Sequence, residues 1–472
     1  MGHTQTAEKE HSHGFYDTLI ALDRYNPIWE QMKVQMRIKY LNELRKQIAE
    51  QSITLSEQIG EITGRPAFEV MSQEIMPVLE MARYLKYHMP SWLRMHYKHY
   101  WVPGFNLTTE HLYFKPLGTV AVILPANFPF SLGMMSAFYL AAAGNTVILK
   151  PSEEYPHITE WMQQIIDESG LSDKVFGIVG GGAESVSSLI ESGFIKKVFF
   201  FGKSTTGIEI KHQCIKQDIP FVLETGGGTA AIIDKDADLI KAASGIAWSA
   251  FYTRGHSCIG TRFVFVNNSI KKAFLKHLMI ESARVLGEYY KPFTLNDETV
   301  KRIKSAVDRG GIFHPVYSEY EQDDNQGEKT FEKPGILDVF IEDPVFKNEI
   351  YDPIITICGI DHFNEAVDKI TESDYLIGTS VWSKNHVKAK ELILQLRTDM
   401  NWINDCSFGM PNLPWGSRNA TGQGSLFSKS SLLEAGTWKW IIDNHNPKRR
   451  FWWHPYNLNK FNLLKKLTRF YR

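Results

Sequence analysis

The chain has 472 residues, more than one hydrophobic core usually serves, so two or three domains are expected. Its 52 Lys and Arg against 53 Asp and Glu leave a formal net charge of −1, so the chain has no overall attraction for nucleic acid. The hydrophobic fraction of 43%, without any run of about 18 apolar residues, is typical of a globular protein with no membrane-spanning helix.

The cysteines indicate a reducing environment. Cys214, Cys258, Cys358 and Cys406 are widely spaced and form no Cys-x-x-Cys pair. This spacing argues against structural zinc and against a disulfide framework, so we expect no metal site and a cytoplasmic location. The first 14 residues are polar, do not form a signal peptide and are expected to be a disordered tail.

The N-terminal part is predicted to be helical over residues 28–100, because apolar residues recur there at three- and four-residue spacing. Residues 101–117 change to short extended runs broken by Pro and Gly. Strands and helices then alternate: strands at 118–124, 146–149, 175–179, 197–201 and 221–223, and helices at 130–143, 157–169, 183–191 and 205–216. This alternation predicts βαβ units and a parallel sheet with right-handed crossovers, which binds ligands outside the carboxyl ends of its strands.

A second α/β block follows, with a polar loop inside it. Its predicted strands are 230–233, 262–266, 354–360 and 376–382, and its predicted helices are 238–253, 269–286, 362–370 and 385–396. The acidic stretch 319–329 is predicted to be a surface loop. The last 29 residues, 444–472, carry eight Lys or Arg, no Asp or Glu, and many aromatic side chains.

Glu224 and Cys258 stand in glycine-rich settings, Leu-Glu-Thr-Gly-Gly-Gly and Gly-His-Ser-Cys-Ile-Gly. A thiolate is a strong nucleophile toward carbonyl carbon, and a carboxylate nearby can activate a thiol or a water. Gly on both sides of a Cys lets backbone and substrate come close. Most lone cysteines, however, are small buried apolar residues, so the pair gains weight only from what lies upstream.

Three upstream loops each allow two interpretations. Asn127, between Pro125 and Pro129, offers either a fixed amide donor for an oxyanion or a local Asx turn. Lys150-Pro-Ser-Glu153 follows a strand and either bonds the ribose of a nucleotide or forms a solvated helix start. The turn 202–207 opens a helix whose N-terminus suits a pyrophosphate, or it is a plain turn with a Ser or Thr cap.

Taken together, these motifs resemble those of the NAD(P)-dependent aldehyde dehydrogenase superfamily. In chain order they are Asn127, Lys150-Pro-Ser-Glu153, Gly202-x4-Gly207, Glu224-x-Gly-Gly, Gly255-x-x-Cys258, Glu349-x-Tyr351-x-Pro353, and Pro414-Trp-Gly followed by Gly422-x-Gly424. The resemblance covers about residues 25–440. It is closest in character to the branch that acts on fatty and aromatic aldehydes.

The resemblance implies a catalytic role for three residues. Cys258 attacks the aldehyde, and the Asn127 amide together with the Cys258 backbone N–H holds the oxyanion. After hydride transfer leaves a thioester, Glu224 activates the water that hydrolyses it to the acid.

The resemblance also implies a cofactor, NAD with NADP as an alternative. Lys150 and Glu153 contact the adenosine ribose, Glu349 the nicotinamide ribose, and Tyr351 the nicotinamide side. The full implied cofactor-binding set is Lys150, Ser152, Glu153, Gly202, Ser204, Gly207, Glu349 and Tyr351.

Six positions depart from the usual motifs without removing a catalytic group. They are Ala126 for Trp, Lys203 for Ser, Thr225 for Leu, Gly228 for Lys, His256 for Gln and Asp352 for Gly. Together they bear on cofactor grip, substrate range and rate.

The expected fold is α/β and aldehyde dehydrogenase-like, with two doubly wound α/β domains and a small β bridging element. Residues 1–100, 117–224 and 405–430 would form the NAD(P)-binding domain, and 225–404 the catalytic domain. Residues 101–116 and 431–446 would form the bridging element, which joins subunits in this family, so a homodimer or homotetramer is implied. Residues 447–472 would form a basic aromatic tail.

The sequence leaves several alternatives open. The tail either lies on an anionic membrane surface as a peripheral contact or packs on its own subunit or a neighbour, and no nucleic-acid partner is expected. The leading function is oxidation of a small-molecule aldehyde to its acid. One rival is a CoA-acylating dehydrogenase, whose members usually lack a Glu at the position of Glu224. The other is a non-catalytic binding protein, against which the intact Asn127, Glu224 and Cys258 argue.

Overall fold

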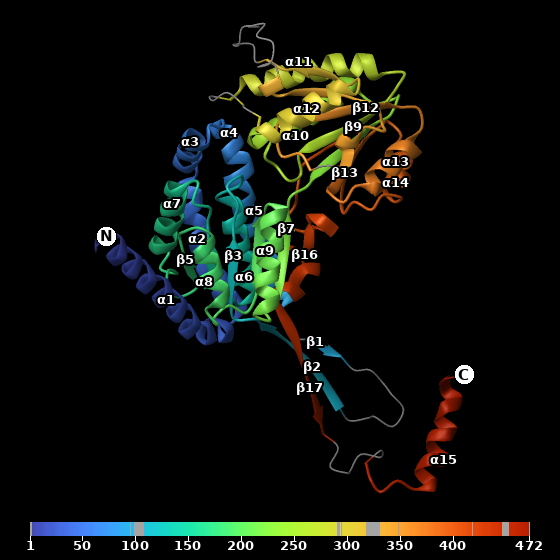
Figure 1. The fold of residues 1–472 in the computed structure, drawn as a ribbon. Helices are drawn as coiled ribbons and strands as arrows, with labels where there is room; N and C mark the ends of the chain where they lie inside the picture. Colours follow the sequence, from blue (N-terminus) through green and yellow to red (C-terminus); the bar gives the residue numbers. More distant parts are fainter. Residues whose placement is uncertain are drawn as a thin grey trace.

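The computed structural model describes residues 2–471 except 95, 99–107, 290–292, 294, 318–330, 348, 418 and 446–452. The predicted surface loop 319–329 lies outside the described residues, as does most of the predicted extended segment before residue 108. Two large sheets and a small projecting one organise the chain (Figure 1).

The first sheet contains the strands predicted before residue 224, and they are parallel. Its order is β15-β16-β7-β6-β3-β4-β5. The parallel strands are β3 (Thr119–Ile123), β4 (Thr146–Lys150), β5 (Phe176–Ile178), β6 (Val198–Gly202) and β7 (Phe221–Thr225). Two antiparallel strands that the sequence pattern did not predict, β15 (Trp415–Ser417) and β16 (Gly422–Leu426), complete the edge beside β7.

Successive residues of each strand point to opposite faces of this sheet, so both faces are apolar. Helices cover both faces. Val120 and Val122 share one core with α2 (Val34–Glu50), α3 (Ser52–Thr63), α5 (Met76–Trp92), α6 (Ser131–Ala143) and α7 (Pro156–Glu168). Ala121 and Ile123 share the other with α1 (Gly2–Gln31), α8 (Ala183–Glu191) and α9 (Ser204–Lys216). The helices before residue 94 also include α4 (Ala67–Val70) and the π-helical turn η1 (Met71–Ile75).

The expectation of a disordered N-terminal tail is wrong, because α1 begins at Gly2. Within this helix Leu19 and Leu22 are fully buried against the sheet. The polar first turns of α1 carry no helical pattern in the sequence. Burial of the apolar residues further along the helix stabilises the helix as a whole.

The second sheet has the order β10-β11-β12-β9-β8-β13-β14. All neighbours are parallel except β10 (Ile312–Pro315), which is antiparallel to β11 (Gly335–Asp338). The remaining strands are β8 (Gly228–Ile233), β9 (Thr261–Asn267), β12 (Ile354–Ile360), β13 (Leu376–Trp382) and β14 (Met400–Ile403). One face packs on α10 (Leu239–Phe251) and α11 (Lys271–Gly287), the other on α12 (Asp297–Asp308), α13 (Phe363–Glu372) and α14 (His386–Ile393). The expected doubly wound α/β class is therefore confirmed.

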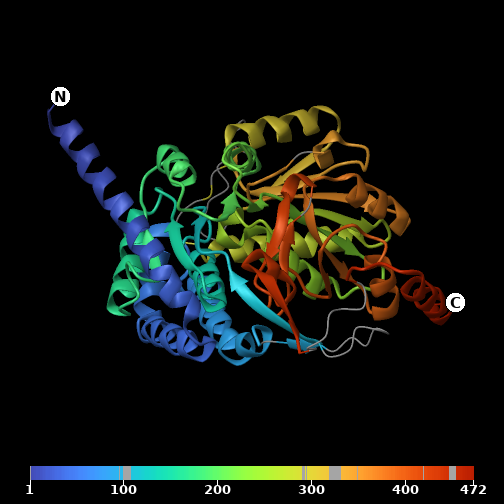
Figure 2. The same ribbon diagram turned by 90° about the horizontal axis from the view of Figure 1, so that it is seen from below.

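A third sheet of order β1-β2-β17 projects from the body (Figure 1). Its strands are β1 (His96–Lys98), β2 (Thr108–Pro116) and β17 (Gly436–Asn444). Helix α15 (Leu458–Leu467) follows it, and Figure 2 shows this helix and the N-terminus at opposite ends of the molecule. Within the described residues no helix combines the length and apolar character needed to cross a membrane. The domain boundaries themselves stay a prediction.

The strand order predicts a crevice at the carboxyl ends of the strands of the first sheet. The chain leaves β3 toward β4 and β5 and returns to β6 on the other side, so the order reverses between β3 and β6. Ligands bind at such a switch point, outside the carboxyl ends of the strands. β7 then runs through Gly226 and Gly227 into β8, so the carboxyl ends of the first sheet meet the amino ends of the second.

Candidate active site

The loop that carries Cys258 connects α10 with the amino end of β9 and follows an unusual backbone path. Thr253, Arg254 and Gly255 are three consecutive residues with left-handed φ angles of 50°, 55° and 75°. A β-branched residue there is strained, and such strain persists only where the surroundings fix it. Glu69 does part of this, because its carboxylate accepts a hydrogen bond of 3.0 Å from the Thr253 N–H.

Gly255 is the position where only glycine fits. A side chain there would place its Cβ 2.6 Å from the backbone nitrogen of Pro353 and 2.7 Å from its Cα. The loop of Cys258 therefore packs directly on the Tyr351-Asp352-Pro353 segment that precedes β12. The glycine before the cysteine thus serves close backbone packing as well as substrate approach.

Asn127 lies against the same loop, although it comes from the first sheet. It follows β3, and its Nδ2 donates to the His256 carbonyl oxygen at 2.6 Å. Its Oδ1 accepts from the N–H of the next residue, Phe128, at 3.1 Å, which is not the bond of an Asx turn, and the oxyanion role stays a prediction. A side-chain amide has two N–H bonds, and the contact with His256 uses one of them.

Cys258 is half-buried, and its surroundings oppose ionisation. Burial, and after it the negative charge of Glu224, raise the pKa of the Cys258 thiol to about 12. Glu224 is buried at the carboxyl end of β7 and lies close enough for its charge to act on the sulfur. Cys258 and Glu224 are thus brought together. In the resting protein the Glu224 carboxylate does not deprotonate the Cys258 thiol.

Glu349 and Tyr351 reach the same junction from the second sheet. The Ser204 hydroxyl donates to Glu349 at 3.3 Å across the crevice, and burial raises the pKa of Glu349. A Cβ on Gly226 would lie 1.6 Å from the Glu349 carboxylate and 2.8 Å from the Tyr351 ring. Gly226 is therefore required for these two side chains to lie beside β7.

The turn after β6 presents an uncapped helix start. The N-cap of α9 is Lys203, whose side chain makes no capping bond, so the alternative of a Ser or Thr cap is wrong. Gly202 accepts from the Gly226 N–H at 3.0 Å, and a Cβ on Gly207 would lie 2.3 Å from a Thr225 methyl. Close packing therefore aims the first-turn N–H groups of α9 at the switch point, where an anion would be favoured.

At the carboxyl end of β4, Lys150 and Glu153 form an ion pair of 3.0 Å. The lysine is buried, whereas the glutamate side chain is mostly exposed. A backbone hydrogen bond, together with Lys150, lowers the pKa of Glu153, so it stays an ionised acceptor at neutral pH. Ser152 instead accepts from the Glu154 N–H at 3.3 Å, which is a local turn. The next helix, α7, begins only at Pro156, so this loop is not a helix start, and its contact with a ribose stays a prediction.

A buried ionic cluster that the sequence reasoning missed joins the two catalytic loops. Arg65 bonds Glu69 at 2.6 Å and Glu74 at 2.8 Å. Glu74 accepts from the Phe130 and Ser131 N–H groups at 3.2 and 2.8 Å, at the start of the helix after Asn127, while Glu69 holds Thr253. Buried charged residues are usually paired and hydrogen-bonded. The signal available in the sequence was therefore the presence of Arg65, Glu69 and Glu74 within ten positions of a helical segment.

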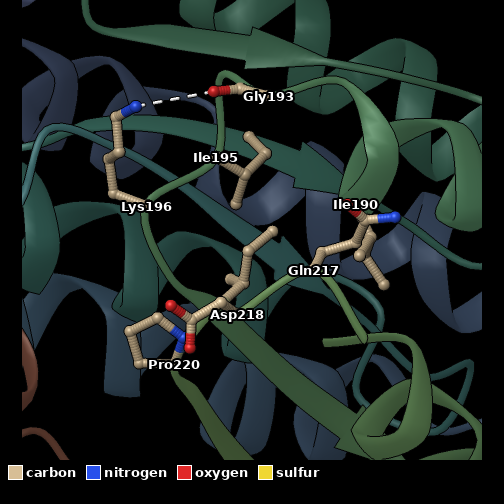
Figure 3. Close-up of a pocket in the computed structure, with 8 residues that line it drawn as sticks. Ile190, Gly193, Ile195, Lys196, Gln217, Asp218 and Pro220 are labelled. Atoms are coloured by element: carbon tan, nitrogen blue, oxygen red, sulfur yellow. Dashed lines mark hydrogen bonds between the residues drawn. The ribbon is translucent and has the colours of Figure 1, made fainter. Parts of the chain in front are cut away.

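A separate cavity of about 230 Å³ lies at the other edge of the first sheet (Figure 3). Ile195, Lys196, Ile219 and Pro220 line it, just before the amino ends of β6 and β7. The Lys196 ammonium group donates there to the Gly193 carbonyl at 3.5 Å. This is the edge opposite the switch point, so the cavity does not belong to the candidate site.

The chain belongs to the aldehyde dehydrogenase family, whose model matches residues 16–441. It is 28% identical to a 4,4'-diapolycopene aldehyde oxidase of Methylomonas sp over 86% of this chain and 77% of that protein. It is 30% identical to a benzaldehyde dehydrogenase of Bacillus subtilis (strain 168) over 72% of each. The family resemblance and the enzyme class, an oxidoreductase acting on the aldehyde group, are confirmed.

Solved structures agree on the fold. The substrate-bound state of Staphylococcus aureus AldH has a TM-score of 0.81 at 23% identity, covering 97% of this chain and 99% of that one. PnpE in complex with nicotinamide adenine dinucleotide has a TM-score of 0.81 at 22% identity, covering 92% and 90%. At this identity the likeness concerns the fold alone.

We predict that alkylation of Cys258 by iodoacetamide rises about tenfold per pH unit from pH 7 to 10 without a plateau, because only the thiolate reacts and the pKa lies at about 12. Glu224→Gln removes a charge that raises this pKa, so alkylation should become faster at each pH. Peptide mass spectrometry gives the rates, with Glu153→Gln as the matched control. Slower alkylation in Glu224→Gln would instead make Glu224 the base for the thiol.

Proposed function

We propose that this protein oxidises an aldehyde to its carboxylic acid with NAD(P)+, using Cys258 as nucleophile. The observation that carries the proposal is the convergence of three groups from separate segments. Asn127 bonds the His256 carbonyl two residues before Cys258, and the charge of Glu224 acts on the Cys258 sulfur. This is the set that nucleophilic attack, oxyanion stabilisation and hydrolysis require.

The chemistry divides among these residues. The Cys258 thiol loses its proton to solvent as its sulfur bonds to the carbonyl carbon, and the oxygen gains negative charge beside the Asn127 amide and the Cys258 N–H. NAD(P)+, when bound, would supply the acceptor for the hydride that leaves this carbon. Glu224 then takes a proton from the water that attacks the thioester, and transfer of this proton to the departing sulfur releases the acid and restores the thiol.

The residues at the crevice fit a dinucleotide. The uncapped start of α9 suits a pyrophosphate, and the ionised Glu153 beside Lys150 suits ribose hydroxyls. Glu349 and Tyr351 would hold the nicotinamide half. We infer a preference for NAD+, because Glu153 would repel a 2′-phosphate. A relative from Rattus norvegicus, 26% identical over 84% of this chain and 88% of that protein, is named NADP-preferring.

The substrate that fits best is an apolar or aromatic aldehyde. Next to Asn127, the Phe128 ring lies 6.3 Å from Tyr252, which stacks on Trp248 at 4.7 Å between ring centres. Aromatic surfaces of this kind favour apolar ligands with a few polar groups at one end. Two relatives, the diapolycopene aldehyde oxidase and the benzaldehyde dehydrogenase, are named for such substrates.

CoA transfer and a purely binding role remain the rival functions. The carboxylate of Glu224 favours attack by water over transfer to CoA, and the approach of Asn127 to the cysteine loop favours catalysis over binding alone. The exposed Trp440, Ile441 and Ile442 on the edge strand β17 support assembly as a homodimer or homotetramer through the projecting sheet.

We predict that Cys258→Ser abolishes oxidation of benzaldehyde and of a long-chain aldehyde, since a hydroxyl is a far weaker nucleophile than a thiolate. NAD+ binding, followed by quenching of tryptophan fluorescence, and the thermal unfolding temperature should not change. Cys406→Ser is the matched control, because Cys406 is buried beneath α10 and bonds the Gly245 carbonyl. Loss of activity in Cys406→Ser with Cys258→Ser still active would contradict the proposal.

We also propose that the C-terminal segment makes a peripheral contact with an anionic membrane on the cytoplasmic side. None of the residues of helix α15 is buried. Phe461 and Leu464 are exposed at 63% and 47%, in a segment that carries Lys465, Lys466 and Arg469. Exposed apolar side chains with basic neighbours suit an anionic lipid surface.

In a flotation assay, the protein should bind phosphatidylcholine–phosphatidylserine vesicles and not phosphatidylcholine alone. The double substitution Lys465→Glu/Lys466→Glu should weaken binding about tenfold or more, because each basic residue near the surface contributes. Lys384→Glu/Lys390→Glu reverses two charges at α14 as the control. No binding to either vesicle type would favour a tail packed on protein, and equal binding to both would contradict the preference for an anionic surface.

A further inference from the structure

Arg262, the second residue of β9, is a large buried cation next to the nucleophile. Its guanidinium donates to the Ala250 carbonyl at 3.3 Å, the Asp352 carbonyl at 3.1 Å and the Ser257 carbonyl at 3.0 Å, and also to the Gly255 carbonyl. Two of these acceptors flank His256 in the Cys258 loop. The other two lie at the end of α10 and in the segment that follows Tyr351.

This contact pattern matches a loop whose regular structure is limited to the distorted 3-10 turn Tyr252–Gly255. Buried carbonyl groups outside helices and sheets must find other donors, and a guanidinium offers five N–H bonds in a fixed planar fork. Arg262 therefore supplies, from one side chain, the donors that hold three segments in register. A lysine would offer a point charge and could not reproduce the fork.

The charge of Arg262 has no direct ion-pair partner in the part of the chain that the structure describes, although the charge of Asp352 acts on it. Among the described residues no carboxylate oxygen lies within 4.0 Å of its guanidinium, which bonds carbonyl oxygens only. Burial lowers the pKa of Arg262, which shows the cost of keeping it charged there. The charged and titratable groups that face Cys258 are Glu224, Arg262, Tyr252 and Tyr351, and Arg262 is the cation among them.

Two glycines make room for this side chain. A Cβ on Gly228 would lie 2.5 Å from the Arg262 Cγ, and one on Gly260 would lie 3.0 Å from its guanidinium. Gly228 is one of the positions where the chain departs from the family pattern, with Gly in place of the usual Lys. The departure therefore has a physical reason in this chain, because a side chain at residue 228 would displace Arg262.

We propose that Arg262 is a positioning residue for the nucleophile: it fixes the loop through the Gly255 and Ser257 carbonyls, and its charge favours the thiolate over the thiol. This rests on the proposed role of Cys258. Arg262 opposes Glu224, which disfavours the thiolate, and thereby keeps a buried sulfur reactive enough to attack a bound aldehyde. The fork sets the geometry, and the charge sets the ionisation.

The two contributions separate in substitutions of one residue. Arg262→Gln removes the charge, Arg262→Lys keeps the charge and loses the fork, and Arg37→Gln is the matched control. Arg37 is also buried and also donates to backbone carbonyls, those of Trp29 and Glu30, but it lies in α2 away from the loop. Circular dichroism and thermal unfolding check that each variant folds.

The first readout is alkylation of Cys258 at fixed pH, measured without any aldehyde. Arg262→Gln should slow it about tenfold for each unit by which the thiol pKa rises. Arg262→Lys and Arg37→Gln should stay within about twofold of the unaltered protein, because neither changes the charge near the sulfur. This readout does not depend on aldehyde oxidation, so it stands apart from the test of the proposed function.

The second readout is kcat and KM for benzaldehyde. Arg262→Lys should lower kcat about tenfold or more with little change in KM, because misplaced donors act on the transition state rather than on substrate binding. If Arg262→Gln does not fold, the kcat of Arg262→Lys alone shows whether the position of the Cys258 loop depends on the guanidinium. Normal kcat in Arg262→Lys, or equal slowing of alkylation in Arg37→Gln, would overturn the proposal.

Discussion

The need to satisfy buried backbone polar groups in an irregular loop governs the catalytic centre. The Cys258 loop has three consecutive left-handed residues and only the distorted 3-10 turn Tyr252–Gly255, so helix and strand hydrogen bonds satisfy few of its backbone groups. Arg262 donates hydrogen bonds to two carbonyl groups of this loop, and Glu69 accepts a hydrogen bond from the Thr253 N–H. Because these partners come from both halves of the molecule, the position of Cys258, the proposed nucleophile, depends on the way the two sheets meet.

The same burial decides the electrostatics. Removing the thiol from water and placing Glu224 nearby raise its pKa to about 12, so the sulfur is protected at rest. This arrangement is consistent with the proposed role of Glu224 in hydrolysis, because that step needs the carboxylate only after the thioester has formed and not for ionising the thiol. The cation of Arg262 offsets part of this effect. The negative charge of Glu224 thus keeps the Cys258 thiol protonated at rest, and the positive charge of Arg262 favours the reactive thiolate.

The sequence predicted the elements with strong periodicity and missed what depends on tertiary contacts. Strands β12 and β13 and helix α8 begin and end at the predicted residues, because their apolar residues recur at the spacing of a strand or a helix. The edge strands β15 and β16 and the helical start of the chain were missed, since their pairing partners lie far away in sequence. Motif order placed Asn127, Glu224 and Cys258 in one site, but Arg65, Glu69 and Arg262 act through backbone bonds that no spacing encodes. Their roles, like those of the cofactor residues, stay predictions.

The most direct test of the account is a single-turnover measurement on Glu224→Gln, which keeps the size of the side chain and removes its basicity. With NAD+ and benzaldehyde, the account predicts a burst of about one NADH per Cys258, then slow turnover, with an acyl adduct on Cys258 by intact mass. Glu391→Gln, at an exposed position of α14, is the control and should show no adduct. Normal turnover to acid in Glu224→Gln, or an unaltered enzyme that turns over only with CoA and releases acyl-CoA, would contradict the account.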